Sequence, residues 1–223
     1  MAETRRPLPD LLRGTAVVLM VFFHFCFDLA YFGQLAVQTN IDPEWVALRT
    51  LIVTLFALVA GLCTGPVSWR RQGILLACAG AATLGSWFIF PHAVIWFGVL
   101  HFFFMAGLLA PLFLGKPRLS LSLGLVLIFA GNLIQATLFN HPALAWLGMM
   151  TYKPLTEDYV PLLPWFGVVL AGVAAQTLLP RPWQNLGSAA CLSPLRWLGR
   201  HSLVIYLLHQ PVLFGLLGLI FKK

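Results

Sequence analysis

Charged residues are scarce in this sequence. Only 7 of its 223 residues are Asp or Glu, and charged residues of both signs make up 9%. Soluble domains carry about 25% charged residues. Hydrophobic residues make up 60% of this chain, and its mean hydropathy is +0.87. The composition therefore excludes a soluble domain of useful size and indicates an integral membrane protein.

Cysteines are few as well, and their spacing matches no zinc motif. Three of the 4 cysteines lie in apolar runs and one lies in a connection expected on the inner side of the membrane; they are Cys26, Cys63, Cys78 and Cys191. None is placed for a disulfide on the oxidising side. We expect all of them to be packing residues, and we expect no metal cofactor.

Internal repeats and low-complexity tracts are absent too, so the sequence predicts a single domain over residues 1–223. Its apolar runs predict about seven transmembrane helices. The expected fold class is therefore all-α, a polytopic membrane helix bundle. The expected helices span residues 10–31, 44–67, 73–90, 94–114, 119–139, 161–179 and 198–221. One long loop is expected at residues 141–160.

The connections between these helices carry an uneven charge. With the N-terminus inside, most of the 14 basic residues lie on the inner side: Arg5, Arg6, Arg13, Arg70, Arg71, Lys116, Arg118, Arg181, Arg196 and Arg200. The outer side then holds Lys153, Lys222, Lys223 and the acidic residues Asp42, Glu44, Glu157 and Asp158. This bias predicts a cytoplasmic N-terminus and an outer C-terminus. Because apolar runs separate the basic residues, nucleic-acid binding is not expected.

The first apolar run contains two ionisable residues, His24 and Asp28, on one helix face. Arg13 lies on nearly the same face, about 16 Å lower. An ionisable side chain at membrane depth costs roughly 2.5–3.5 kcal/mol, so it usually has a function. An Asp beside His24 would fix the imidazole tautomer and raise its basicity, as a general base requires. Alternatively, His24 and Asp28 only satisfy each other, and Arg13 snorkels to the inner surface.

The last apolar run carries a second polar stripe. Ser202, Tyr206 and His209 recur at helical spacing, and His209 reaches the middle of the bilayer. His209 either takes part in chemistry or makes only an interhelical hydrogen bond. At the inner end, Arg200 and His201 are either phosphate ligands or interface anchors.

Several segments resemble a known family. RGTAVVLMVFFHF separates Arg13 from His24 by ten residues, which resembles the Arg-x10-His signature of type 3 membrane acyltransferases. Together, LRGTAVVLMVFFHFCFDL, FGVLHF, DYVPLLPWFG and GRHSLVIYLLHQP resemble the bacterial heparan-alpha-glucosaminide N-acetyltransferase catalytic family. The resemblance spans most of the chain, and its first and last motifs are specific in combination.

The resemblance implies a multi-pass acyltransferase of the bacterial inner membrane. It would move an acetyl or other acyl group from cytoplasmic acyl-CoA to an acceptor, often a sugar, on the outer side. His24 matches the catalytic histidine, His209 the histidine of the last helix, and Arg13 the arginine that we assign to the CoA side. Asp28 is the third catalytic candidate. Direct transfer and an acyl-histidine intermediate both stay open.

CoA is polyanionic, so its binding site needs basic residues at the cytoplasmic entrance. The residues expected to bind it are Arg13, Arg70, Arg71, His101, Arg200, His201, Ser202 and Tyr206. In the outer loop, Trp146, Tyr152 and Asp158 are expected to hold a sugar or glycan by stacking and hydrogen bonds. The expected partners are the lipid bilayer, acyl-CoA and the glycan acceptor, and a homodimer stays open.

Three other hypotheses use the same residues. A proton-coupled small-molecule transporter also needs intramembrane His and Asp, although such folds often show repeated halves. An anchoring or assembly protein would give His24 a purely structural role. A metal site built from His24, Asp28 and His209 is the third alternative.

Overall fold

The computed structural model of the chain describes residues 6–89, 91–156, 158–180 and 186–221. Within these ranges all regular secondary structure is helical. Six residues used in the predictions above lie outside the described residues; they are Arg5, Phe90, Glu157, Arg181, Lys222 and Lys223.

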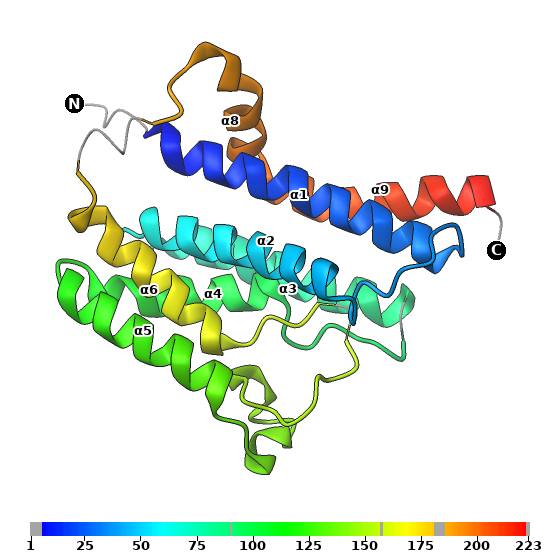
Figure 1. The fold of residues 1–223 in the computed structure, drawn as a ribbon, viewed down its shortest axis with the longest axis horizontal. Coiled ribbons are helices and arrows are strands. Elements are labelled where there is room, and N and C mark those ends of the chain that lie inside the picture. Colours follow the sequence, from blue (N-terminus) through cyan, green and yellow to red (C-terminus); the bar gives the residue numbers. More distant parts are fainter. Residues whose placement is uncertain (1–5, 90, 157, 181–185, 222–223) are drawn as a thin grey trace. The chain divides into compact units, whose positions relative to one another are not determined.

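The described helices follow one another in the order that Figure 1 shows. The longer ones are α1 (Pro7–Tyr31), α2 (Pro43–Leu62), α3 (Trp69–Ile89), α4 (Val99–Leu109), α5 (Pro117–Leu133), α6 (Leu162–Leu178), α8 (Ser193–Arg200) and α9 (Ser202–Phe221). Short 3-10 helices are η1 (Ala110–Phe113), η2 (Thr137–Asn140), η3 (Ala145–Leu147) and η4 (Ala190–Leu192). The chain divides into two compact units, a terminal unit of residues 1–56 and 180–223 and a central unit of residues 57–179.

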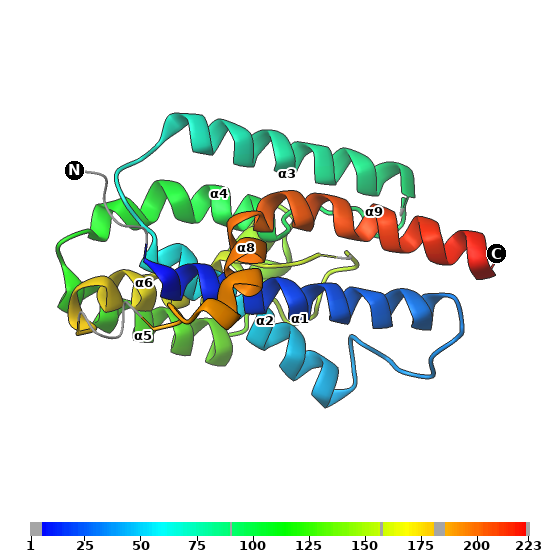
Figure 2. The ribbon, with the colours of Figure 1, turned by 90° about the horizontal axis from the view of Figure 1, so that it is seen from above.

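In the terminal unit, α8 packs on α1 through two glycines (Figure 1). A Cβ atom at Gly14 of α1 would overlap the carbonyl oxygen of Leu195, and one at Gly199 of α8 would overlap that of Asp10. Small residues let helix backbones approach this closely in membranes. α9 also packs against α1 and runs beside it, as Figure 2 shows.

Apolar side chains of α1, the first part of α2 and α9 form the core of the terminal unit. Met20, Phe23 and Ile52 are buried there, and Trp45 and Tyr206 pack against them. The core therefore holds the segment of α1 that leads up to His24.

The central unit uses glycines and one glutamine in a similar way. A Cβ atom at Gly167 of α6 would overlap the carbonyl oxygen of Gly124 in α5, and one at Gly61 of α2 would overlap the backbone of α6. Nε2 of Gln176 in α6 donates to the carbonyl oxygens of Gly61 at 2.7 Å and Thr64 at 3.0 Å. Gln176 thus adds a side-chain donor to two carbonyls at the end of α2, of which that of Gly61 also accepts from the N–H of Thr64 at 3.1 Å.

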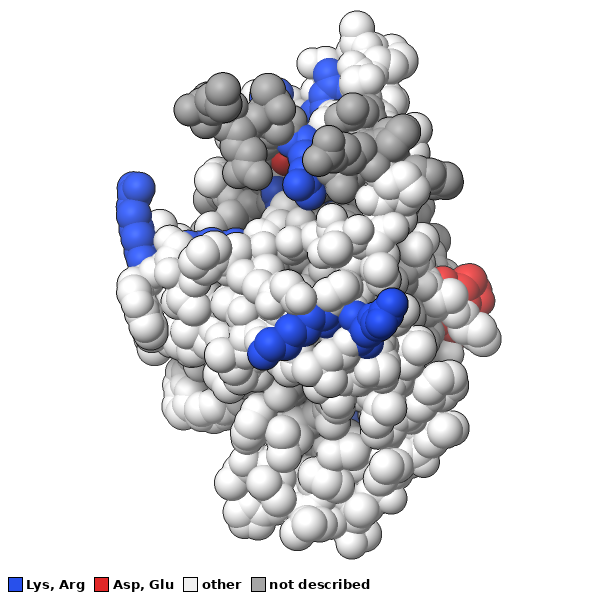
Figure 3. Space-filling view, turned by 90° about the vertical axis from the view of Figure 1, so that its left-hand side faces the viewer, with Lys and Arg blue, Asp and Glu red and all other residues white. Residues whose placement is uncertain are grey.

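The described helices are those of a membrane protein. Four of them, α1, α2, α3 and α9, are long and apolar enough to cross a membrane, and Val99–Phe113, α5 and α6 are shorter apolar helices. Figure 3 shows mostly uncharged residues in one view, with few Lys and Arg side chains. The all-α membrane class is thus confirmed, whereas the count of seven spans and the orientation stay predictions.

Several predicted helix boundaries are corrected. The second helix ends at Leu62 instead of residue 67, and the third begins at Trp69 instead of residue 73. The last expected helix is two helices, α8 and α9, because α8 packs across α1 whereas α9 runs beside it; His201 between them has φ −103° and ψ 15°. The fourth begins only at Val99, where side chains cap its first turn. The fifth ends at Leu133, because Ile134 is extended with φ −96° and ψ 120°.

We expect Gly14→Ala to destabilise the protein by about 1–3 kcal/mol, because the added methyl group overlaps the backbone of α8. Gly215→Ala in α9 is the matched control, since a Cβ atom there meets nothing within 4 Å. Thermal unfolding of the purified proteins in one detergent measures the difference. Equal midpoints for the two variants would contradict the close contact of α1 and α8.

Candidate active site

Two histidines from opposite ends of the chain meet in the terminal unit. Nε2 of His209 in α9 lies 3.1 Å from Nδ1 of His24 in α1, and the ring centroids are 4.7 Å apart. Both side chains are half-buried. The sequence singled out each residue, and the fold brings them into direct contact.

Backbone carbonyls determine which nitrogens of the neutral pair carry protons. Nδ1 of His209 lies 2.7 Å from the carbonyl oxygen of Tyr206 and 3.1 Å from that of Ile205, so it is a donor. Its Nε2 is therefore an acceptor. Nδ1 of His24 lies 3.0 Å from the carbonyl oxygen of Met20 and donates to His209 as well. Nε2 of His24 is thus left with a lone pair, and no other described residue hydrogen-bonds to it.

Aromatic rings hold the two imidazoles in place. The ring of Phe23 meets that of His24 edge-on, with centroids 5.5 Å apart and planes at 89°. The ring of Tyr206 lies 5.8 Å from that of His209. Phe23 and Tyr206 both belong to the apolar core of the terminal unit. The imidazoles are therefore positioned by packing as well as by hydrogen bonds.

Asp28 makes its hydrogen bond to α9 and not to His24. Nε2 of Gln210 donates to Oδ1 of Asp28 at 2.7 Å. Asp28 is fully buried, and neither its Oδ2 nor Oε1 of Gln210 has a hydrogen-bond partner among the described residues. The expectation that Asp28 fixes the tautomer of His24 is therefore corrected, because backbone carbonyls and His209 do this. Gln210 was not among the predicted site residues. Its position in an apolar run, directly after His209, could have indicated a role in the site.

Two basic residues of the terminal unit were predicted to face the donor. Nη1 of Arg13 lies 3.7 Å from Oδ1 of Asp10, three positions earlier in α1. Arg200, the last residue of α8, is exposed. The structure thus gives Arg13 an acidic neighbour on its own helix.

Two further predicted residues, His201 and Ser202, lie where α8 meets α9. Nδ1 of His201 lies 2.9 Å from the carbonyl oxygen of Trp197, and their rings are 4.4 Å apart. Ser202 is the first residue of α9. These contacts favour the interface-anchor alternative for His201.

In the central unit, His101 and Asp158 cap the first turn of α4. Nδ1 of His101 accepts from the backbone N–H of Gly98 at 3.2 Å, and Oδ2 of Asp158 accepts from that of Val99 at 2.9 Å. A carboxylate at a helix N-terminus contributes about 0.3–1 kcal/mol. Nε2 of His101 lies 3.4 Å from Oγ1 of Thr83. Both predicted site residues thus stabilise the start of α4.

The loop before α6 holds the other two predicted sugar ligands. Nε1 of Trp146 donates to the carbonyl oxygen of Ala143 at 2.9 Å, whereas Tyr152 is 57% exposed. The hydroxyl of Tyr159 donates to the carbonyl oxygen of Ala145 at 2.5 Å, and burial raises the pKa of Tyr159 to about 12. Tyr159 therefore stays neutral at physiological pH and holds the loop together.

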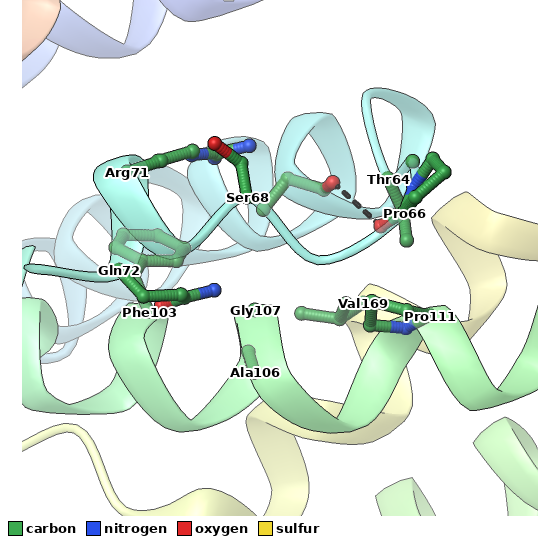
Figure 4. A pocket seen from close by; sticks show the side chains of 12 residues that line it. Thr64, Pro66, Ser68, Arg71, Gln72, Phe103, Ala106, Gly107, Pro111 and Val169 are labelled. Carbon is green, nitrogen blue, oxygen red and sulfur yellow. Dashed lines mark hydrogen bonds between the residues drawn. The ribbon is translucent and has the colours of Figure 1, made fainter.

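The remaining predicted donor ligands, Arg70 and Arg71, lie in the first turn of α3. Arg70 is exposed, and Arg71 lines a pocket of the central unit (Figure 4). Among the described residues, no group of three or more His, Cys, Asp or Glu side chains is placed to hold a metal ion.

Comparison with known proteins gave one match. The profile of a family described as heparan-alpha-glucosaminide N-acetyltransferase, catalytic, matches residues 5–211, which include both histidines. No curated protein and no solved structure matches the chain. The match confirms the resemblance found in the sequence motifs.

Histidine-selective 15N labelling tests the arrangement of protons. At neutral pH, His24 and His209 should each carry their proton on Nδ1, and the His24 proton should show a coupling to Nε2 of His209. His209→Ala should abolish this coupling, whereas His92→Ala, at an exposed position, should preserve it. A proton on Nε2 of His24 in the parent protein would contradict the arrangement.

Proposed function

Because the chain belongs to the heparan-alpha-glucosaminide N-acetyltransferase catalytic family, we propose that it transfers an acyl group across the membrane. The donor is cytoplasmic acetyl-CoA or another acyl-CoA, and the acceptor is a sugar or glycan on the outer side. The single observation that carries the proposal is the His24–His209 pair, which leaves one basic nitrogen open within a membrane-spanning unit.

His24 is the general base of this proposal. Its Nε2 takes the proton from an acceptor hydroxyl or amine, whose oxygen or nitrogen attacks the carbonyl carbon of the thioester. The new C–O or C–N bond forms as the C–S bond breaks. The departing CoA thiolate then takes the proton from His24, which returns the imidazole to its neutral form. In the alternative mechanism, Nε2 itself attacks the carbonyl carbon of the thioester, the C–S bond breaks, and CoA leaves as the thiolate from a cationic acyl-histidine. The acceptor hydroxyl or amine then attacks the acyl carbon, the C–Nε2 bond breaks, and the acceptor's proton goes to the CoA thiolate, which returns His24 to its neutral form.

His209 is a positioning residue. Once Nε2 of His24 is protonated, both ring nitrogens of His24 carry hydrogen, and Nδ1 still donates to Nε2 of His209. That hydrogen bond becomes charge-assisted and is strengthened. His209 therefore orients the neutral base and stabilises its protonated form.

Asp28 and Gln210 supply a place for the acceptor. Four residues along α1 correspond to a rise of about 6 Å, so Asp28 lies one turn from His24. The Oδ2 atom of Asp28 and the Oε1 atom of Gln210 are buried acceptors without partners among the described residues. Hydroxyl or amine groups of a sugar would donate to them. This role replaces the tautomer-fixing role predicted for Asp28.

The donor approaches from the side that carries most basic residues. We place the N-terminus in the cytoplasm, the C-terminus outside and seven helices across a bacterial inner membrane, on the charge distribution of the connections. Arg13, Arg70, Arg71 and Arg200 then face the cytoplasm and attract the phosphates of CoA. Both units, residues 1–223 together, act as one catalytic domain that needs no metal.

Replacing His24 by Ala should lower transfer to the acceptor by at least about 10²–10⁴-fold, because proton transfer is lost. Acyl-CoA affinity should stay within a few-fold, since a proton-transfer group acts mainly at the transition state. Radiolabelled acyl-CoA with inverted vesicles measures both quantities, and His92→Ala is the control. A folded His24→Ala protein that transfers at nearly the parental rate would refute the role.

A labelled His24 peptide after incubation with acyl-CoA alone would identify the acyl-histidine mechanism. Uptake of a sugar into liposomes without acyl-CoA, lost in His24→Ala, would instead favour the proton-coupled transporter.

Cysteine labelling tests the orientation. In a background without the native cysteines, Ile41→Cys and Ser188→Cys place exposed thiols in the connections before α2 and before α8. An impermeant maleimide on intact cells should label position 41 and spare position 188, because the proposed topology puts them outside and inside respectively. The reverse pattern would overturn the direction of transfer.

A further inference from the structure

A polar pocket opens in the central unit where α2 ends and α3 begins (Figure 4). It has about 450 Å³ of empty space, part of it open to the surroundings. Thr64, Ser68, Arg71 and Gln72 provide the polar lining, and α4 and α6 close it with apolar residues such as Phe103 and Val169.

Gln72 is the first sign that this pocket takes a ligand. Its side chain is only 4% exposed, and Oε1 has no hydrogen-bond partner among the described residues. The carboxamide extends from α3 toward Gly107 of α4, where a Cβ atom would overlap Nε2 (Figure 4). An unsatisfied buried polar group costs about 1–3 kcal/mol. A ligand amide would remove this cost, because it offers a donor and an acceptor to the carboxamide.

The start of α3 is the second, independent sign. A helix N-terminus carries a partial positive charge and free N–H groups, which favour acidic residues or anions. The first turn of α3 has Arg70 and Arg71 and no acidic residue. Arg71 and Ser68 both line the pocket. A phosphate placed there would meet a guanidinium, a hydroxyl and the helix N-terminus, an arrangement that binds anions well.

We infer that this pocket binds the phosphate-bearing pantetheine arm of acyl-CoA. A phosphate lies against Arg71, Ser68 and the first turn of α3, and an amide of the arm pairs with the carboxamide of Gln72. The inference rests on the proposed function, which supplies acyl-CoA as the donor. A phospholipid headgroup is the other source of a phosphate, but a glycerophospholipid lacks the amide that Gln72 requires.

Calorimetry with the full-length protein in detergent tests the inference with two probes. Acetyl-CoA carries phosphates and the amides of its pantetheine arm, whereas adenosine 3′,5′-bisphosphate carries phosphates on the same nucleoside and no amide. Gln72→Leu should lower the affinity for acetyl-CoA about tenfold, because one buried hydrogen-bonded amide pair is lost, and should leave the affinity for the bisphosphate unchanged. Arg71→Gln should weaken both probes and reduce their sensitivity to salt. Gln135→Leu, at an exposed position in the same unit, is the matched control and should change neither.

Stability separates a binding role from a structural one. Gln72→Leu removes a polar group that lacks a partner, so its unfolding midpoint should equal or exceed that of the parent. A lower midpoint with unchanged acetyl-CoA affinity would make Gln72 structural and overturn the inference.

Three further outcomes are decisive. If the parent binds acetyl-CoA and both Gln72→Leu and Arg71→Gln bind it equally well, the inference fails while the proposed donor stands. If the parent does not bind acetyl-CoA at all, the proposed function fails as well. If the two variants change only the retention of phosphatidylglycerol in mixed nanodiscs, the pocket holds a lipid headgroup and the inference is wrong.

Discussion

The hydrogen bond between the imidazoles of His24 and His209 is the contact on which the proposed active site depends. Backbone carbonyl oxygens determine its direction: those of Tyr206 and Ile205 accept from Nδ1 of His209, and that of Met20 accepts from Nδ1 of His24. In the low-dielectric interior such a chain of hydrogen bonds polarises its members and is strengthened. The position of α1 relative to α8 and α9 must therefore be well defined. The contact at Gly14 and Gly199 contributes to this, because backbone meets backbone there with no flexible side chain between.

Much of this was visible in the sequence, because apolar runs and their polar interruptions are local signals. The membrane class, His24 and His209 followed from them, and the motif match named the family. The partner of Asp28 did not, since Gln210 lies 182 positions away and only the fold joins them. The break at His201 was also hidden, because the same apolar pattern fits one helix or two. The cap that His101 provides for Gly98 was hidden too, since this contact depends on where α4 begins.

Both units contain buried polar atoms without hydrogen-bond partners, although leaving such atoms unpaired costs free energy. Among the described residues these are Oδ2 of Asp28 and Oε1 of Gln210 in the terminal unit, and Oε1 of Gln72 and Oγ1 of Thr156 in the central unit. The other buried amides and hydroxyls of the described helices are largely satisfied by backbone carbonyls, as Gln176 is. The proposed substrates would supply the missing partners: hydroxyl or amine groups of the acceptor for Asp28 and Gln210, and an amide of acyl-CoA for Gln72.

The pairing of α1 with α9 also has a consequence for biosynthesis. The ribosome delivers α1 well before α9, so the membrane receives His24 and Asp28 long before His209 and Gln210 exist. During that interval α1 must remain in the bilayer with polar groups that cost several kcal/mol to bury. Until α9 is present, His24 and Asp28 lack the partners that His209 and Gln210 provide. The two hydrogen bonds that join α1 to α9 can therefore form only late in synthesis, once Gln210 has entered the membrane.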